Sequence, residues 1–543
     1  MIIDLNTVEQ AALPSADVCI VGAGIVGLSL AHRLRKLGKR VVVLERGNRS
    51  PSQAEVGEGL QDTGSRYSGG LKGRAFGLGG TSGLWGGQLI GTTPEDRMSR
   101  PWMNVEPWPV SDHEINSAYQ DACSWLNVPP DLVMPQSANE SSFGRLGQHF
   151  LVRRTFSLPF TRRNFAELLR DGIEHDPDLI ILLNACASGS AELGKNQDSL
   201  DTLVVHSRGE STLSIHAKVF VVCAGAIEST RLLQLLTAPA RVKHPSLNNL
   251  GKNFRDHISI PVGKFSVRDQ SVFFSNVSPR FERAGLLHPR FELSAETQKT
   301  FALPSAFLHV VARSNGRSVL DAVRRILGQV QLHKFGARQL LIDSFLVLRG
   351  LPELAKIIYW RVFKKALYYP SGHEFILQAD LEQVPRDDCH LSLAATCDGQ
   401  LVQKVQINWG IGVADIRHAN KLAELFAAEW AAGPVGQAAT IDVRPVSDSL
   451  TEQDGEAAYD VYHPIGSTAF GMDPEKYAVD ENLCIRGFSN LFTSSTAALP
   501  SSGCANPTLS AVALAFRLAC HIAASFDSTD KAAKTLITPG AEQ

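Results

Sequence analysis

The chain has 543 residues, enough for roughly three to four average domains, and 44% of them are hydrophobic while 20% are charged. This composition disfavours a disordered, collagen-like or membrane-spanning protein. Because 53 Lys and Arg nearly balance 55 Asp and Glu, the chain has no excess of positive charge. Its overall charge therefore gives no indication of nucleic acid as a partner.

The first sixteen residues lack the basic and apolar regions of a secretory signal. We therefore expect a cytoplasmic protein. The nine cysteines are scattered and never form a Cys-x-x-Cys pair. That spacing argues against a disulfide framework and against a zinc site, so no metal centre is expected.

Residues 17–46 predict a strand, a tight turn, a helix and a second strand. The apolar run 18–21 is typical of a buried strand, and residues 25–37 have helical spacing. The apolar run 41–44 predicts the second strand. This order is the beginning of a parallel α/β sheet.

A dinucleotide-binding pattern lies in the first turn: Gly22, Gly24 and Gly27 form GxGxxG, and Glu45 and Arg46 follow the second strand. The first glycine permits the turn, the second lets the backbone approach a pyrophosphate, and the third allows close helix–strand packing. The helix N-terminus attracts the phosphates, and a carboxylate can accept hydrogen bonds from a ribose hydroxyl. The motif fits both FAD and NAD, but one such motif in so long a chain favours FAD.

The rest of the chain alternates between strand-like and helical segments. Residues 57–91 are rich in Gly and Ser, which indicates backbone running close to a large ligand, and residues 165–215 have an α/β pattern. Strands are expected at 218–226, 258–312 and 372–409, and helices at 228–236, 415–432 and 507–525.

Residues 313–368 stand apart because they combine long apolar helical stretches with eleven basic and only three acidic residues. Within them begins the amphipathic segment 353–370, which carries Trp and Tyr. Such a helix can lie on an anionic membrane surface. The alternative, which we prefer from the sequence alone, is a lid or subdomain helix that packs on the protein while its charges are solvated.

Six ordered groups of segments give the sequence a resemblance to the glucose-methanol-choline (GMC) oxidoreductases, whose members bind FAD and oxidise alcohols. Besides the first turn, the segments are GLGGTSGLWGG at 77–87, WPVSDHEINSAY at 108–119, VVCAGAIESTRLL at 221–233, LGKNFRDH at 250–257 and the blocks YHPIGSTAFGM at 462–472 to SGCANPTLSAVALA at 502–515. The resemblance covers residues 18–523 and is weakest at 258–440.

The resemblance implies an α/β protein with a Rossmann-type FAD-binding domain formed by residues 1–257 and 455–543. An α+β substrate domain built on an antiparallel sheet would be inserted at 258–454, with the basic helical insertion at about 313–370.

The family's catalytic pair corresponds to His463 and Asn506, and the His/Asn combination is similar to that of pyranose oxidase and cholesterol oxidase. Oxidising an alcohol requires loss of the hydroxyl proton and transfer of the carbon-bound hydride to flavin N5. A histidine with an ordinary pKa of about 6.5 is suited to accept the proton. An amide can hold the hydroxyl oxygen without competing for that proton.

The resemblance also implies contacts with FAD. In the family, the loop containing Gly79 wraps the flavin and pyrophosphate, and the helix that follows Asn506 faces the flavin pyrimidine. Ser495 stands where members usually have an acid. The remaining implied contacts are Gly80, Thr81, Trp85, Gly86, Ala187, Cys223, Ala224, Gly225, Pro507 and Thr508.

Leu84 occupies the position where members with covalently attached flavin have a histidine. Leucine cannot form that bond, so we expect non-covalent FAD.

The expected function is FAD-dependent oxidation of a CH–OH group, first of a sugar or glycoside. A sterol, long-chain alcohol or lipid-linked substrate at the inner membrane face is the second interpretation. A redox-neutral lyase or isomerase, a non-catalytic FAD-binding scaffold and an NAD-dependent dehydrogenase stay open. Oxygen, a quinone or a carrier protein would reoxidise the flavin.

Overall fold

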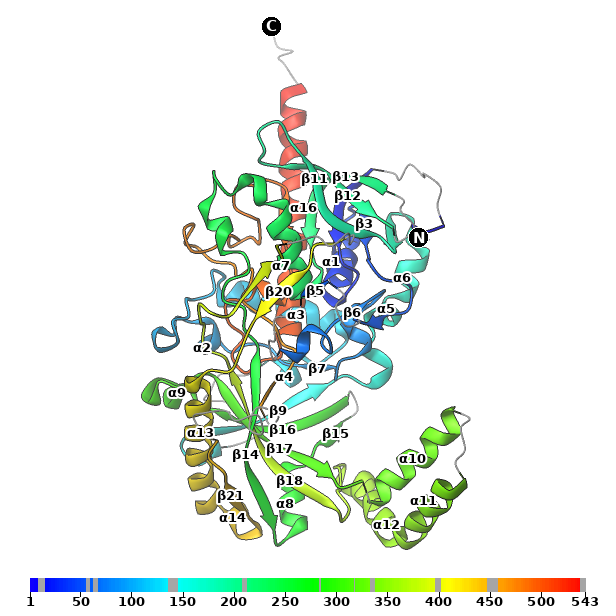
Figure 1. Cartoon of the computed structure of the whole chain (residues 1–543), viewed down its shortest axis with the longest axis vertical. Helices are drawn as coiled ribbons and strands as arrows, with labels where there is room; N and C mark the ends of the chain where they lie inside the picture. The colour runs from blue at the N-terminus through cyan, green and yellow to red at the C-terminus, as the bar shows by residue number, and fades with distance from the viewer. Residues whose placement is uncertain are drawn as a thin grey trace.

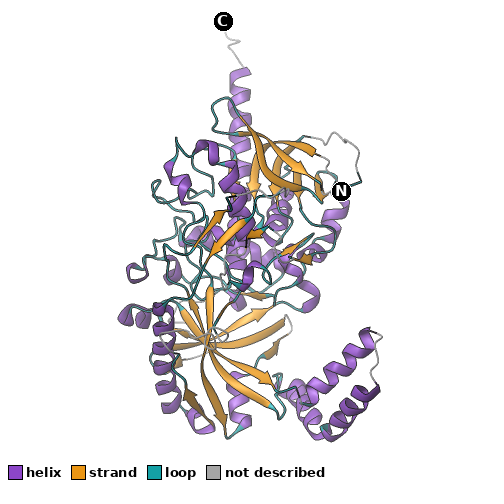
Figure 2. Ribbon diagram, viewed as in Figure 1, coloured by secondary structure: helices purple, strands orange, loops and turns teal. Residues whose placement is uncertain are grey.

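The computed structural model describes residues 1–7, 15–54, 59–61, 67–134, 145–207, 212–282, 285–316, 318–332, 337–395, 402–446 and 458–537. Figures 1 and 2 show two sheet-centred layers and a helical appendage that extends from the lower layer. This architecture confirms the predicted α/β class with an added antiparallel sheet.

The first layer contains a mostly parallel sheet in the order β1-β10-β3-β2-β13-β12-β11, with β23 paired to β13. Short apolar runs form its central strands because both faces are covered. The strands are β1 (Ile2–Asp4), β2 (Ala16–Val21), β3 (Val41–Leu44), β10 (Leu179–Leu183), β11 (Cys186–Leu193), β12 (Leu200–His206), β13 (Thr212–Val222) and β23 (Leu491–Thr493).

Helices α1 (Ile25–Lys36), α7 (Gly225–Leu236) and α16 (Pro507–Ile537) belong to this layer. Helix α16 runs through its middle in Figure 1, and its residues Leu509 and Phe516 lie in the hydrophobic core. It ends twelve residues beyond the predicted helix. The predicted strand–turn–helix–strand unit is confirmed by β2, α1 and β3.

The second layer is built on an antiparallel sheet in the order β21-β14-β18-β17-β16-β9-β7. Helix α13 (Val413–Ala432) covers one face, where Phe426 and Trp430 are buried against sheet residues such as Phe291. The strands are β7 (Gln88–Leu89), β9 (Phe150–Ser157), β14 (His257–Val267), β16 (Gly285–Leu293), β17 (Ala306–Ser314), β18 (His373–Glu382) and β21 (Ala439–Val443), with β8 (Arg145–Leu146), β15 (Arg280–Glu282) and β22 (Tyr459–Asp460) on the sides.

The strand pairing does not follow the predicted domain boundaries. Strands β7 and β9 precede residue 257 but pair within the second sheet. Conversely, β19 (His390–Leu393) and β20 (Val405–Asn408) form a small sheet with β5 (Leu60–Gln61) beside α7. Each layer therefore contains strands from the residue range predicted for the other. The domain limits at 257 and 455 stay predictions.

The strand-like interpretation of 258–312 is incomplete, because two helices interrupt it. Helix α8 (Gln270–Val277) begins at Asp269, whose carboxylate accepts hydrogen bonds from two backbone N–H groups. Helix α9 (Ala295–Phe301) begins at Ser294, whose hydroxyl accepts one. These are ordinary helix N-caps that the apolar pattern does not reveal.

The predicted helical insertion is confirmed as three helices: α10 (Val319–Leu332), α11 (Ala337–Arg349) and α12 (Leu351–Tyr359), which continues as a π-helical turn at Trp360–Lys364. Figure 1 shows them at the lower right, extending from the end of the sheet. Within the turn and α12, only Trp360 and Ile357 pack on the core of the second layer.

The described residues also contain α2 (Pro94–Arg97), α3 (Asp112–Leu126), α4 (Pro130–Val133), α5 (Phe165–Leu168), α6 (Arg170–His175), α14 (Pro434–Ala438), β4 (Ser52–Gln53) and β6 (Ala75–Phe76).

Candidate active site

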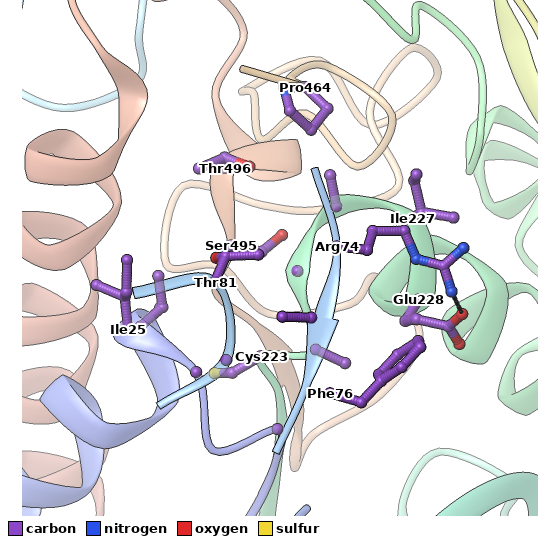
Figure 3. Close-up of a pocket in the computed structure, with 18 of the residues that line it drawn as sticks. Ile25, Arg74, Phe76, Thr81, Cys223, Ile227, Glu228, Pro464, Ser495 and Thr496 are labelled. Atoms are coloured by element: carbon purple, nitrogen blue, oxygen red, sulfur yellow. Dashed lines mark hydrogen bonds and ion pairs between the residues drawn. The ribbon is translucent and has the colours of Figure 1, made fainter. Parts of the chain in front are cut away.

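A cleft opens where β2, β3 and β13 end and α1 and α7 begin, and the space free of protein atoms in it, counted to its open mouth, is about 1390 Å³. Figure 3 shows Ile25, Thr81, Cys223 and Ser495 around it, which come from four distant parts of the sequence. Ligands of parallel α/β sheets bind at this edge, beyond the carboxyl ends of the strands.

The three glycines of the first turn shape one end of the cleft. Gly22 has φ +106°, and a Cβ there would lie 2.6 Å from the Cys223 carbonyl oxygen. A Cβ on Gly27 would lie 1.9 Å from the Gly22 oxygen. A Cβ on Gly24 would meet no protein atom within 4 Å, although Gly24 lines the cleft. The cleft thus has the bare backbone and helix N-terminus that a pyrophosphate requires.

Glu45 is buried at the end of β3, and three loops bind its carboxylate. The backbone N–H groups of Ala23, Gly47 and Gly77 donate to it at 2.9, 2.8 and 2.8 Å. Burial raises the pKa of Glu45, and these hydrogen bonds act in the opposite direction. Glu45 therefore ties the turn after β2 to the Gly-rich loop; its contact with a ribose stays a prediction.

A charged cluster that the sequence analysis missed lies at the same end. Arg74 and Arg231 each donate to Glu228 at 2.8 Å, as Figure 3 shows for Arg74, and Arg46 lies 3.8 Å away. Burial favours the neutral acid, but the arginines outweigh it and lower the pKa of Glu228 to about 2. Three guanidinium groups therefore surround one buried carboxylate at the edge of the cleft. The i,i+3 spacing of Glu228 and Arg231 was the one visible signal.

A second cavity of about 1320 Å³ adjoins the cleft, and the predicted pair lies where the two meet. The Asn506 Nδ2 and His463 Nε2 atoms are 3.2 Å apart. Asn506 immediately precedes α16, whose first residues line the cleft. Both cavities are lined by Ile25, Gly73, Thr81, Tyr462, His463 and Thr508.

His257 fixes the tautomer of His463, and the sequence analysis gave it no role. Its Nε2 lies 2.6 Å from the Gly503 carbonyl oxygen, and its Nδ1 lies 3.0 Å from His463 Nδ1. A carbonyl only accepts, so His257 Nε2 carries the proton and its Nδ1 accepts. His463 Nδ1 must then donate, which leaves a lone pair on His463 Nε2, the atom beside Asn506.

Burial, together with the neighbouring His257, lowers the pKa of His463 to about 3. Burial also lowers the pKa of His257. Both imidazoles are therefore neutral around pH 7, and His463 Nε2 is a basic atom whose lone pair accepts a hydrogen bond from the Asn506 amide in this structure.

A buried carboxyl group holds the backbone of His463. The His463 N–H donates to Asp256 Oδ1 at 2.8 Å, and the Tyr67 hydroxyl donates to Asp256 Oδ2 at 2.8 Å. Burial and the nearby Asp460 raise the pKa of Asp256 well above its ordinary value. Tyr462 has φ +65°, so the histidine is presented from a strained turn that these bonds hold in place.

The structure brings nearly all predicted site residues to these two cavities. Gly27 and Gly79 are the exceptions: Gly27 packs on Gly22, and the Gly79 N–H donates to Ala23 at 2.9 Å. Individual FAD contacts stay predictions. The predicted cofactor residues that line a cavity are Gly22, Gly24, Glu45, Arg46, Gly80, Thr81, Trp85, Gly86, Ala187, Cys223, Ala224, Gly225, Ser495, Pro507 and Thr508.

Comparisons with known proteins agree with this geometry. The profile described as GMC oxidoreductase matches residues 385–515, and the one described as FAD dependent oxidoreductase matches residues 17–68. A curated relative, the probable oxidoreductase OrdL of Haemophilus influenzae, is 33% identical over 113 residues. That match spans 20% of this chain and only 22% of the relative.

Solved structures share the fold over nearly the whole chain. Pyridoxine 4-oxidase from Mesorbium loti matches with a TM-score of 0.54 and 15% identity over 93% of this chain and 99% of its own. An FAD-dependent oxidoreductase from Chaetomium thermophilum gives 0.57 and 14%, over 94% and 100%. A formate oxidase variant from Aspergillus oryzae, studied for FAD modification, gives 0.53 and 13%, over 95% and 100%.

The parallel sheet with its glycine turn, joined to an antiparallel sheet that closes over a His/Asn pair, defines an FAD-dependent oxidoreductase. The predicted resemblance to the GMC oxidoreductases is confirmed, because residues 385–515 match that family's model and the fold is shared with pyridoxine 4-oxidase.

Proposed function

We propose that this protein oxidises a hydroxyl group to a carbonyl with FAD held non-covalently in the cleft. The observation that carries the proposal is the unprotonated Nε2 of His463, 3.2 Å from the Asn506 amide at the junction of the two cavities. A CH–OH group placed there meets a base and a hydrogen-bond donor at once.

His463 Nε2 accepts the hydroxyl proton, and the Asn506 amide donates a hydrogen bond to the oxygen that loses it. The Nδ1–H of the resulting imidazolium still donates to His257 Nδ1, and His257 keeps its own proton on Nε2, which donates to the Gly503 carbonyl oxygen. Bound FAD supplies the acceptor for the carbon-bound hydride. Leu84 lines the second cavity and offers no atom for a bond to the flavin.

A sugar or glycoside is the preferred substrate because the second cavity combines aromatic faces with charged and amide groups. Trp85 and Phe307 provide ring faces, and Asp380, Gln88 and Lys72 provide polar groups for several hydroxyls. Sugars are bound by this combination of stacking and hydrogen bonding.

A sterol, long-chain alcohol or lipid-linked substrate is the second candidate. It is supported by the exposed apolar side chains of the helical insertion, which are described below. A lipid-linked saccharide would satisfy both observations.

An anaerobic bleaching screen tests the proposal. The purified protein is expected to be yellow and to release FAD on denaturation. Free sugars, aryl glycosides, a sterol and a long-chain alcohol are then added in turn without oxygen, and loss of the visible flavin band by the sugars or glycosides is the expected result. Bleaching by the sterol or the long-chain alcohol alone supports the second candidate. A colourless protein that takes up no FAD overturns the proposal.

A further inference from the structure

Helix α11 turns an apolar face to solvent. Leu341, Phe345 and Leu348 are 73, 64 and 66% exposed, and Ile342 is exposed beside them. The spacing i, i+4 and i+7 places these side chains on one side of the helix. Single exposed hydrophobic residues need no explanation, but a contiguous row marks a contact surface.

The same surface continues on α12 and the π-helical turn. Leu351, Ile358, Tyr359 and Val362 are exposed, and Phe363 is 72% exposed. In the part of the chain that the structure describes, nine of the twenty-one exposed large hydrophobic residues lie between 341 and 363. The other twelve are scattered over the rest of the described chain, so the exposed apolar side chains are densest in the appendage.

The acidic and basic side chains of the insertion differ in how exposed they are. The three acidic side chains have partners within the protein: Asp343 is buried and paired with Arg325 at 2.6 Å, the half-buried Asp321 accepts from the Ser318 hydroxyl, and the half-buried Glu353 accepts from the Ser371 N–H. Most of the basic residues of the insertion whose side chains the structure describes are exposed. They are Arg313, Arg324, Arg338, Arg349, Lys356, Arg361, Lys364 and Lys365.

We propose that the surface of α11 and α12 docks this protein on an anionic lipid bilayer. The apolar faces enter the boundary between headgroups and acyl chains, and the surrounding Lys and Arg bind the lipid phosphates, as in other interfacial amphipathic helices. Trp360 and Ile357 fix the element to the body of the protein.

Two observations favour a membrane over other occupants. A second copy of the chain would bring a basic rim against a basic rim, whereas an anionic surface complements it. The appendage also extends from the body in Figure 2, so a flat surface can reach both helices. The one described helix that is long and apolar enough to cross a membrane, Pro507–Phe526, is mostly buried, which leaves peripheral contact as the mode of attachment.

Co-sedimentation with vesicles tests the proposal, and it does not depend on the enzymatic reaction. Vesicles of phosphatidylcholine are compared with vesicles that also contain phosphatidylglycerol, using the full-length protein with its cofactor. Binding is expected only to the anionic vesicles and should weaken as salt is added. The F345E/F363E variant should lose binding, and K364A/K365A should bind roughly 30-fold more weakly, about fivefold per charge.

The control is V242E, which adds one of the two negative charges of F345E/F363E at a site that is 92% exposed but lies in the first layer. It should bind as the unaltered protein does, and circular dichroism and FAD content should be unchanged in all variants. Equal binding of F345E/F363E and V242E overturns the proposal. So does absence of binding to the anionic vesicles together with a concentration-dependent dimer that F345E/F363E abolishes, which would assign the surface to a second copy.

Discussion

The cleft and the helical insertion use apolar and charged residues in opposite ways. In the cleft, charged groups such as Glu45 and Glu228 are buried, and each is bound by backbone N–H groups or arginines. In the insertion, Phe345 and Phe363 face solvent while Asp343 is buried. A buried charge with its partners in place prepares a site for a ligand that enters the protein. An exposed apolar face is completed by something outside it.

Substitutions in one region should therefore leave the function of the other region unchanged. The largest expected effect is in the cleft. His463→Ala is expected to lower the rate of anaerobic flavin bleaching by at least about a hundredfold, because it removes the group that accepts the proton. FAD content and vesicle binding should not change. Stopped-flow absorbance with the substrate found in the screen measures the rate. Unchanged bleaching would mean that His463 is not the base.

A smaller effect is expected at His257, which acts through His463. His257→Ala should slow bleaching about tenfold, because the tautomer of His463 is no longer fixed. It should also raise the pKa of His463, since the neighbouring imidazole that lowers it is gone. The pH below which the rate falls should then be higher than in the unaltered protein.

His257→Asn is the matched variant, because the amide oxygen can accept from His463 Nδ1. It should restore most of the rate, whereas the pH profile should stay shifted as in His257→Ala, because the imidazole is missing in both variants. If Ala and Asn slow the rate alike, His257 has only a structural role.

Glu45→Gln tests the carboxylate that joins the loops of the cleft. The amide offers one acceptor oxygen where three backbone N–H groups now bind two, so FAD should bind about tenfold more weakly. Fluorescence titration of the apoprotein with FAD measures this, and Glu475→Gln, on the exposed surface, is the control. Equal affinities would show that these hydrogen bonds do not shape the FAD site.

The buried histidines predict acid sensitivity. Because the pKa of His463 falls from 6.5 to about 3 on folding, only the unfolded chain binds a proton between these values. The free energy of unfolding should decrease as the pH falls from about 6.5, by about 1.4 kcal/mol per pH unit for this group. His463→Gln should flatten that slope, and His113→Gln, on the surface, should not. Denaturant unfolding across this range gives the slopes, and parallel slopes would contradict the assignment.

The sequence predicted what local patterns encode. The turn at Gly22, Gly24 and Gly27 has its spacing fixed by one strand and one helix, so the chain shows it directly. The pair His463 and Asn506 was found through the family resemblance of the segments around it. Gly22, Gly24, His463 and Asn506 line the two cavities, and their roles stay predictions.

The missed features depend on contacts between distant segments. His257 lies 206 positions from His463, and Arg74 lies 154 positions from Glu228, so no spacing relates them. Strand β9 pairs with β16 in the second sheet, and the residues of β9 alone do not show which strand it pairs with. The periodicity of α11 likewise does not show whether its apolar side packs on the protein or stays exposed.

The most direct test of the central claim follows the flavin band in a single anaerobic turnover, using the substrate from the screen with hydrogen or deuterium on its carbinol carbon. Removal of the hydroxyl proton by His463 together with loss of the carbon-bound hydride predicts complete bleaching that is slower with deuterium. Turnover of the substrate without bleaching, or bleaching at equal rates with both isotopes, would contradict transfer of the carbon-bound hydride at the His463–Asn506 pair.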